Sequence, residues 1–428
     1  MKLFTHKKAF YLLWGGQSLS LLGSGLTRFA IMVWAYENNG SVTDMVLLPF
    51  FACLAFIILS PFAGMVADRR SRKWIMFFSD LGSGLATLGL LLLYLNGKLA
   101  FWHLYLVEGL SGALEAFQSP AFFSSISLLI PKEEYVRSNA LIGLAKSMVT
   151  MIAPALASVV LTFGGMSRVM IIDLLTMLPG ILVVILISLP KPEESEEGAR
   201  ARGDFWHEFR FGFRYIFSHP GLRSITLIFV GINLFAGITY LSILSPMILT
   251  RTGGNKIALG TVQTVMGIGG ILGGLILTLW KSPRRKAAIF VWSTFGSFLF
   301  CDFFTAVSRS VWSWSIAGFL SELTIPFIVS PFYSIWQEKV PGDVQGRVFA
   351  VREMLLSSPS PIGYLLGGLL ADNFFEPFFA HPNFLSPLMG WGPGAGMSAM
   401  FLLTAMLGSL TGLMGILNKN VKKLDLAE

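Results

Sequence analysis

The chain has 428 residues, of which 54% are hydrophobic and only 13% are charged. Soluble domains carry about 25% charged residues, so the composition indicates lipid as the main solvent and excludes an ordinary soluble protein. The net charge of +8 is expected from basic cytoplasmic loops, and no nucleic-acid partner is predicted. Cys53 and Cys301 lie far apart in apolar stretches, a spacing that predicts no disulfide framework, metal site or cofactor.

Twelve segments can each form a transmembrane helix, because one crossing takes roughly 20 mostly apolar residues. They form two groups of six, separated by a polar interruption. The sequence therefore predicts an all-α polytopic membrane protein with twelve transmembrane helices in two six-helix pseudo-repeat halves. The segments centre on residues 10–36, 44–66, 74–96, 101–129, 139–163 and 168–189, and then on 222–249, 257–280, 286–307, 311–335, 348–371 and 396–417.

Three domains follow from this pattern: an N-terminal half at residues 1–190, a cytoplasmic linker at 191–220 and a C-terminal half at 221–428. The linker places Phe205, Phe209, Phe213 and Phe217 at helical spacing among arginines. That pattern predicts an amphipathic helix lying on the inner leaflet. Its expected role is to tether the halves.

Lysine and arginine predict the orientation. About 25 of the 32 cations lie at the two ends of the chain, in the linker and in the loops on the same side. This asymmetry predicts that both termini are cytoplasmic, in agreement with an even number of helices. The opposite loops hold only Lys98, Arg168, Arg251, Lys256 and Arg309.

The two halves repeat one cytoplasmic loop. The chain reads IPKEEYVRSNAL between the fourth and fifth segments and VPGDVQGRVFAV between the tenth and eleventh. Pro131 and Arg137 align with Pro341 and Arg347 at a constant offset of 210 residues. Two six-helix halves with matching cytoplasmic loops are typical of a transporter.

The loop after the second segment, GMVADRRSRKW, begins at Gly64 and ends at Trp74. It resembles the cytoplasmic signature of the major facilitator superfamily, Gly-x-x-x-Asp-Arg/Lys-x-x-Arg/Lys-Arg/Lys. The segments GQSLSLLGSGLTRFA, PFYSIWQEKVPGDVQGRVF and KKLDL further resemble the macrolide-efflux branch. Siderophore exporters and lysophospholipid flippases look similar at this level, so these cargoes remain alternatives.

The resemblance implies that this loop packs against the eleventh helix and holds one conformation of a gate. Gly64 would let a neighbouring backbone approach, and Asp68 would accept hydrogen bonds. A pure topology anchor is the alternative, in which the cations hold the helix end at the cytoplasmic surface. The predicted gate latch comprises Gly64, Asp68, Arg69, Arg72, Lys73, Asp80, Arg137 and Arg347.

Ionisable residues inside the bilayer are costly and are functional candidates by default. Glu108 and Glu115 lie two helical turns apart in the fourth segment, and Glu322 lies near the centre of the tenth. Asp173 lies near an outer end and is expected to be wet. The resemblance implies that segments 1, 4, 7 and 10 line a central cavity. The predicted substrate and proton-coupling residues are Glu322, Glu108, Glu115, Arg28, Asn233 and Tyr240, the last two assigned to one helical face.

A carboxylate in a low-dielectric cavity can load a proton on one side of the membrane and release it on the other. The resemblance therefore implies export of a small amphiphilic substrate in exchange for protons, by a monomer in a bacterial inner membrane and in contact with its lipids. The chain departs from many antiporters of the superfamily, because its fourth segment contains no arginine. For Arg28 and Glu108, a structural ion pair that only fixes helix packing is the alternative.

An enzyme and a channel are the alternative classes of protein. No HExxH motif occurs, and the five histidines are scattered, so no catalytic residue is predicted. No Walker A loop occurs either, which argues against a primary pump. A channel gives no reason for the repeated cytoplasmic loops.

Overall fold

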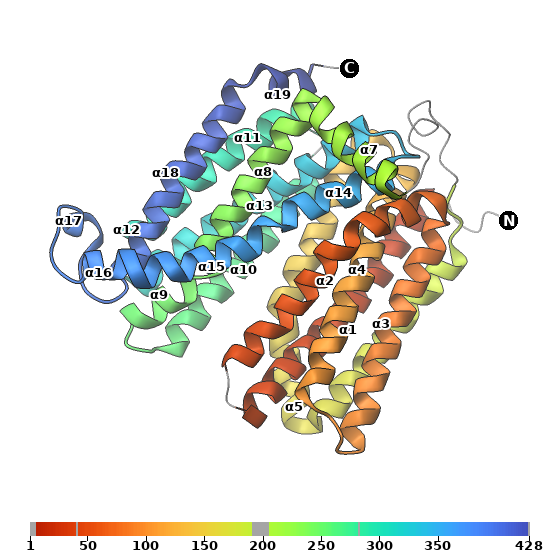
Figure 1. Cartoon of the computed structure of the whole chain (residues 1–428), viewed down its shortest axis with the longest axis horizontal. Coiled ribbons are helices and arrows are strands. Elements are labelled where there is room, and N and C mark those ends of the chain that lie inside the picture. Colours follow the sequence, from red (N-terminus) through yellow and green to blue (C-terminus); the bar gives the residue numbers. More distant parts are fainter. Residues whose placement is uncertain (1–5, 40–41, 191–204, 281–282, 427–428) are drawn as a thin grey trace. The chain divides into compact units, whose positions relative to one another are not determined.

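The computed structural model describes residues 6–39, 42–190, 205–280 and 283–426, apart from the side chains of residues 36–39, 42–47, 68–69, 205 and 256. Throughout these ranges the backbone forms helices and turns, with no strand (Figure 1). The all-α class predicted from the sequence is confirmed.

The chain divides into two compact units. Unit 1 comprises Met1–Ser138, Ala145–Ile216 and Gln337–Met354, and unit 2 comprises Asn139–Leu144, Phe217–Trp336 and Leu355–Glu428. The units differ from the two predicted halves because Gln337–Met354, from the second half of the sequence, groups with unit 1, and Asn139–Leu144, from the first half, groups with unit 2.

The first part of the chain contains α1 (His6–Asn39), α2 (Val42–Arg69), α3 (Arg72–Leu95), α4 (Phe101–Leu129), η1 (Lys132–Glu134), α5 (Tyr135–Leu186) and α7 (Phe205–Ser218). The second part contains α8 (Pro220–Ile238), α9 (Leu244–Arg251), α10 (Lys256–Leu279), α11 (Lys286–Gly296), η2 (Ser297–Asp302), α12 (Phe303–Val307), α13 (Val311–Lys339), α14 (Gln345–Ser357), α15 (Pro359–Leu370), η3 (Ala371–Phe375), α16 (Glu376–Phe379), α17 (Ser386–Met389), α18 (Ala395–Leu417) and α19 (Lys419–Leu424).

Ten stretches of the described residues are long and apolar enough to cross a membrane. One of them, Lys132–Leu186, is 55 residues long, more than twice what one crossing needs. Gly165 interrupts it with φ +68°, a conformation that glycine adopts readily, so this stretch holds two helices. The 29-residue α4 is not among the ten; it carries Glu108 and Glu115 but is as long as its neighbours. With α4 and the second part of α5, the number of spans reaches the predicted twelve.

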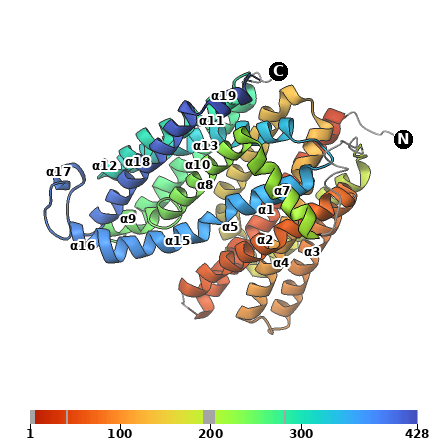
Figure 2. The ribbon, with the colours of Figure 1, turned by 45° about the horizontal axis from the view of Figure 1, so that its top comes forward.

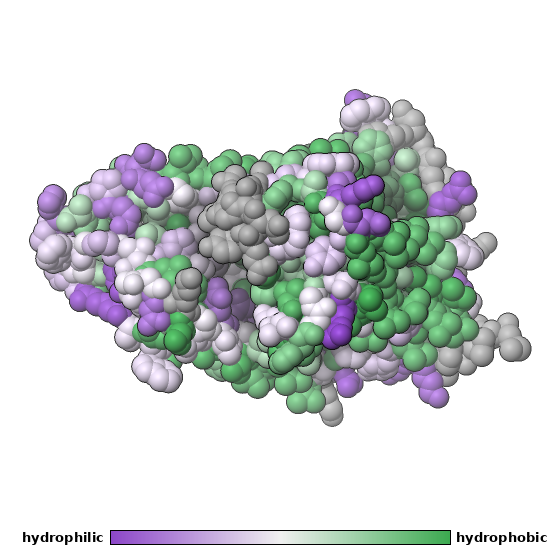
Figure 3. All heavy atoms as spheres, turned by 90° about the horizontal axis from the view of Figure 1, so that it is seen from below, coloured by the Kyte–Doolittle hydropathy of each residue, from purple (hydrophilic) through white to green (hydrophobic). Residues whose placement is uncertain are grey.

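The outward surface of α3 shows why these helices need lipid. Trp74, Phe78, Leu85 and Leu92 recur at helical spacing and are all at least half exposed. Exposure of such an apolar stripe to water is unfavourable, whereas contact with the hydrocarbon of a lipid bilayer is not. Hydrophobic residues also cover much of the face of the molecule that Figure 3 shows.

Glycines bring helix backbones together within each unit. In unit 1, α2 lies beside α4 (Figure 2), and a Cβ at Gly112 would collide with the carbonyl group of Ala52. In unit 2, a Cβ at Gly237 of α8 would lie 3.1 Å from the Cα of Gly363 in α15. Small residues at such contacts are typical of membrane helices, whose association depends on close packing.

Three predicted spans are interrupted. Segment 222–249 stops at Ile238 and resumes at Leu244; the Thr239 hydroxyl donates to the Phe235 carbonyl oxygen over 2.9 Å, a bond that often bends helices. Segment 286–307 contains the π-helical turn η2. Segment 348–371 breaks between α14 and α15, next to Pro359, which cannot donate a backbone hydrogen bond.

Candidate functional site

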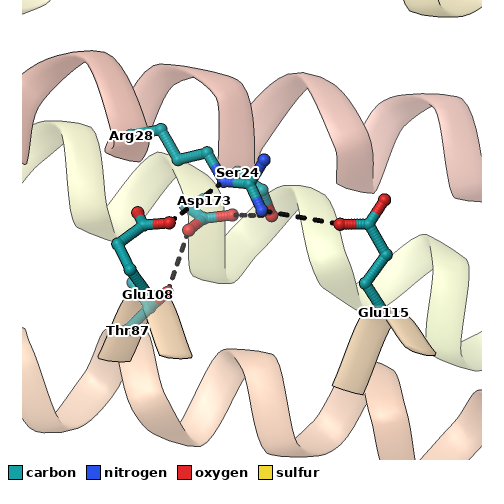
Figure 4. Close-up of polar contacts among 6 residues, drawn as sticks. All are labelled: Ser24, Arg28, Thr87, Glu108, Glu115 and Asp173. Carbon is teal, nitrogen blue, oxygen red and sulfur yellow. Dashed lines mark hydrogen bonds and ion pairs between the residues drawn. The ribbon is translucent and has the colours of Figure 1, made fainter. Parts of the chain in front are cut away.

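Charged residues from the first and fourth spans come together in unit 1 (Figure 4). The Nε atom of Arg28 lies 3.8 Å from Oε2 of Glu108, and its Nη2 atom lies 3.9 Å from Oε2 of Glu115. The seven-residue spacing on α4 places both glutamates on one face, since 3.6 residues make one turn. Arg28 on α1 therefore contacts both carboxylates.

The two glutamates differ in exposure. The side chain of Glu108 is 8% exposed, whereas those of Glu115 and Arg28 are 55% and 51% exposed. Oxygen–nitrogen distances near 4 Å are ionic contacts rather than hydrogen bonds. Within this group of ions, Glu108 is therefore buried, whereas Arg28 and Glu115 are exposed.

Asp173 on α5 is a third carboxyl group beside Arg28 (Figure 4). Its oxygens accept hydrogen bonds from the Thr87 hydroxyl over 3.0 Å and from the Ser24 hydroxyl over 3.3 Å. The expectation that Asp173 is wet is wrong, because this residue is only 5% exposed. Gly23 is the reason: a Cβ there would lie 2.9 Å from the Cα of Asp173, so α1 approaches α5 too closely to admit water.

We call Arg28, Glu108, Glu115 and Asp173 the charge cluster. It contains one cation and three carboxyl groups, so it carries an excess of negative charge when all are ionised. Such an excess is unfavourable in a low-dielectric region. Binding protons or a cationic ligand relieves it.

Asp80 takes part in a separate polar network of unit 1. Its two carboxylate oxygens accept hydrogen bonds from the Gln17 amide over 2.7 Å and from the Gln118 amide over 2.6 Å. Gln118 also donates to the oxygen of Gln17 over 2.8 Å. The network joins α1, α3 and α4, so Asp80 holds helices of one unit together.

Unit 2 contains the other predicted coupling residues. Glu322 is half-buried on α13, and none of the described residues gives its carboxylate a hydrogen bond or ion pair. The Asn233 amide donates to the Leu356 carbonyl oxygen over 2.8 Å, close to the break before Pro359. Tyr240 lies beyond the end of α8, so the assignment of Asn233 and Tyr240 to one helical face is wrong. The Tyr240 hydroxyl instead donates to Asp302 over 2.9 Å.

Gly64 lies where α2 meets α14 in unit 1. A Cβ on this residue would lie 2.8 Å from both the Cα of Arg347 and the Gly346 carbonyl oxygen, and closer still to the Cβ of Ala350. Only a glycine permits this contact without displacement. The end of α2 therefore packs on the start of the eleventh span, and Gly64, which was predicted to begin a loop, lies within the helix.

Arg72 and Lys73 both donate to backbone carbonyl groups; Arg72 reaches the segment before α14, whereas Lys73 binds the end of α5. Arg72 is 6% exposed and donates to the carbonyl oxygens of Ser124, over 2.8 Å, and of Gly342. Lys73 donates to the Ile187 carbonyl oxygen over 2.9 Å. Arg137 is exposed and makes no ion pair within the described part of the chain. The side chains of the two other predicted latch residues, Asp68 and Arg69, lie outside the described residues.

The linker helix α7 also contacts the start of α14 (Figure 1). The carboxylate of Glu208 lies 3.9 Å from the guanidinium of Arg347, and both side chains are buried. The Tyr215 hydroxyl donates to the Lys339 carbonyl oxygen over 3.2 Å. A Cβ on Gly212 would lie 3.1 Å from the Arg347 carbonyl oxygen. The predicted amphipathic helix thus turns a polar, glycine-containing face toward α14 and leaves Phe213 exposed.

A family model described as Major Facilitator Superfamily matches residues 13–364. The chain belongs to this superfamily. Macrolide efflux protein A of Streptococcus pyogenes is 24% identical over 368 residues, which cover 86% of this chain and 90% of that protein. The multidrug efflux pump Tap of Mycolicibacterium fortuitum is 22% identical over 421 residues, which cover 95% of this chain and 94% of that protein.

The fold agrees with the family. The crystal structure of a bacterial homologue of the iron transporter ferroportin, in an outward-facing state, matches with a TM-score of 0.65 at 16% identity and covers 96% of this chain and 100% of that chain. Such a likeness shows the fold alone. The protein is a polytopic membrane transporter of the major facilitator superfamily, a family of transporters rather than enzymes, and the resemblance predicted from its cytoplasmic loop is confirmed.

Sequence reasoning missed several residues that the superfamily fold brings together. Glu208 lies in the polar linker, so it does not stand out as a charged residue within an apolar segment. Its spacing to Gly212 and Tyr215 does place the three residues on one face of a helix. Gln17 and Gln118 are uncharged and lie far apart in the chain. Asp302 was recognisable as an ionisable residue inside a span, but nothing in the sequence gave its partners.

Proposed function

We propose that this superfamily member is a secondary active exporter. It moves small amphiphilic compounds such as macrolides out of the cell by alternating access, in exchange for protons. It works as a monomer among the lipids of a bacterial inner membrane, with both termini in the cytoplasm. The names of the similar efflux proteins support this cargo class.

The charge cluster is the observation that carries the proposal. One exposed guanidinium, Arg28, faces a buried Glu108, an exposed Glu115 and a buried Asp173. Macrolides and many other exported drugs are amphiphilic weak bases, and a carboxylate can hold either such a cation or a proton. Competition between the two for one carboxylate is the simplest form of antiport. The fourth span contains no arginine of its own, and Arg28 of α1 brings a guanidinium to the α4 glutamates.

Glu322 supplies the matching feature in unit 2. It is a half-buried carboxylate with no cation among its described neighbours. An ionised group of this kind costs about 3 kcal/mol near the centre of a span on insertion scales. We infer that Glu322 exchanges its proton during transport.

Substitution of Glu322 by glutamine should therefore abolish uphill export while leaving the protein folded. The test expresses the chain in cells that lack their own pumps and follows efflux of a drug panel that includes macrolides, with and without a protonophore. Glu133→Gln, which neutralises an exposed glutamate on η1, is the matched control and should export normally.

Two results would contradict the proposal. Export that survives both the protonophore and Glu322→Gln would rule out proton coupling through this residue. If the well-expressed protein moves no drug in the panel, the drug cargo is wrong, and lysophospholipids and siderophores become the next cargoes to test. Trans-stimulated exchange of tracer would still separate a carrier from a channel.

A further inference from the structure

Two irregular backbone segments of unit 2 meet at one buried aspartate. The first is the turn at residues 239–243 between α8 and α9, and it carries Tyr240. The second is the π-helical turn η2, which ends at Asp302. Single π-helical turns are frequent at functional sites, and transporters often place ion sites where spanning helices are interrupted.

Asp302 is 1% exposed and is held by hydroxyl groups. Its Oδ1 atom accepts a hydrogen bond from the Tyr240 hydroxyl over 2.9 Å, and its Oδ2 atom accepts one from Thr404 of α18 over 2.8 Å. The ring of Tyr240 packs edge-on against Phe401, with the ring centroids 5.3 Å apart. The carboxyl group is therefore closed off by an aromatic pair and by α18.

The groups facing this carboxyl are neutral or weakly acidic. Tyr240 and the adjacent Cys301 are the titratable groups beside it, and the Ser321 hydroxyl of α13 faces the Tyr240 hydroxyl. Glu322 follows Ser321 but points about 100° further round the helix. No cation contacts Asp302 within the described ranges. A fully buried carboxylate without a cation is costly, and one bound proton removes its charge.

We propose that Asp302 is a proton-binding carboxyl group of unit 2, and that Tyr240 responds to its protonation. In the ionised form, Asp302 accepts both hydrogen bonds. When it gains one proton, it can donate to the Tyr240 oxygen, which reverses that bond and frees the Tyr240 hydroxyl proton to be donated to the Ser321 hydroxyl. The step moves one proton and no electrons. This inference rests on the proposed proton-coupled export and adds a second proton site to it.

Infrared difference spectroscopy of the purified full-length protein in lipid tests the site without any cargo. At neutral pH we expect a protonated carboxyl C=O band that Asp302→Asn removes. Asp372→Asn, which neutralises an exposed aspartate of the same unit, should leave the band intact. Tyr240→Phe and Thr404→Val each remove one hydrogen bond and should shift the band frequency, so the test does not depend on one variant folding.

A wild-type spectrum whose C=O band is untouched by all three site variants would overturn the inference, because Asp302 would then be ionised and purely structural. The readout separates this failure from failure of the proposed function. A band lost in Asp302→Asn supports the site even if no drug is exported. Drug export with no such band contradicts the site and leaves the exporter proposal standing.

Discussion

Replacement of Gly64 by leucine should lower transport at least about fivefold while the protein still inserts into the membrane. A Cβ at this position meets Ala350, the Cα of Arg347 and the Gly346 carbonyl oxygen, the last two at 2.8 Å. These are mainly backbone and Cβ atoms, which cannot rotate away. Overpacking of this kind costs about 1–3 kcal/mol, and about 1.4 kcal/mol is a factor of ten in an equilibrium constant. The conformation that brings α2 against α14 is therefore the one that is lost.

The matched control is Gly89→Leu, because Gly89 of α3 is exposed and a Cβ there meets no atom within 4 Å. Cross-linking between α4 and the start of α14 reports on whether α14 keeps its place beside α2. Cysteines at Ser127 and Gln345, whose side chains are 2.6 Å apart, should cross-link in a background without Cys53 and Cys301. Addition of Gly64→Leu should reduce the yield. Equal transport by the Gly64 and Gly89 variants would refute a gate role for this contact.

Glu108→Gln should abolish proton-driven export, whereas Glu115→Gln should change it by less than about threefold. The two side chains contact the same guanidinium at similar distances but differ in exposure, 8% against 55%. Exposed ion pairs contribute about 0–1 kcal/mol, whereas a buried carboxylate changes its environment strongly when it gains a proton. The two variants thus test the effect of burial, because the two glutamates lie at almost the same distance from Arg28.

At saturating cargo, both variants should still exchange labelled for unlabelled cargo across the membrane, since exchange needs no net proton movement. Parallel assays of gradient-driven export and of exchange on equal amounts of protein provide the comparison. Equal loss of both activities in Glu108→Gln at saturating cargo would assign Glu108 to folding rather than to proton coupling. A stronger effect of Glu115→Gln than of Glu108→Gln would contradict the ordering by burial.

The fold was largely predictable, because it depends on apolar length and on repetition. Twelve apolar segments, the basic loops and the repeated Pro131–Arg137 pattern are all local features of the sequence. The breaks were less predictable. Gly165 and Pro359 mark two of them, but the π-helical turn before Asp302 has no proline or glycine at its centre and depends on tertiary packing.

The site was predictable only in part. Glu108 and Glu115 share a helix, so their spacing placed them on one face. Asp173 lies near the outer end of its segment, and this position alone indicates contact with water. Gly23, on another helix, lets α1 approach closely enough to bury it. Contacts between residues distant in the chain, such as Arg347 with Glu208, leave no local pattern in the sequence.

The most direct test of the central claim uses the purified protein in liposomes with an imposed pH gradient and a radiolabelled macrolide. A weak base also collects passively in an acidic lumen, so protein-free liposomes and liposomes with the Glu322→Gln protein set the baseline. We predict accumulation above this baseline when the lumen is acidic, and its collapse when a protonophore is added. Accumulation equal to the baseline, with an exchange-competent protein in the membrane, would contradict proton-coupled export.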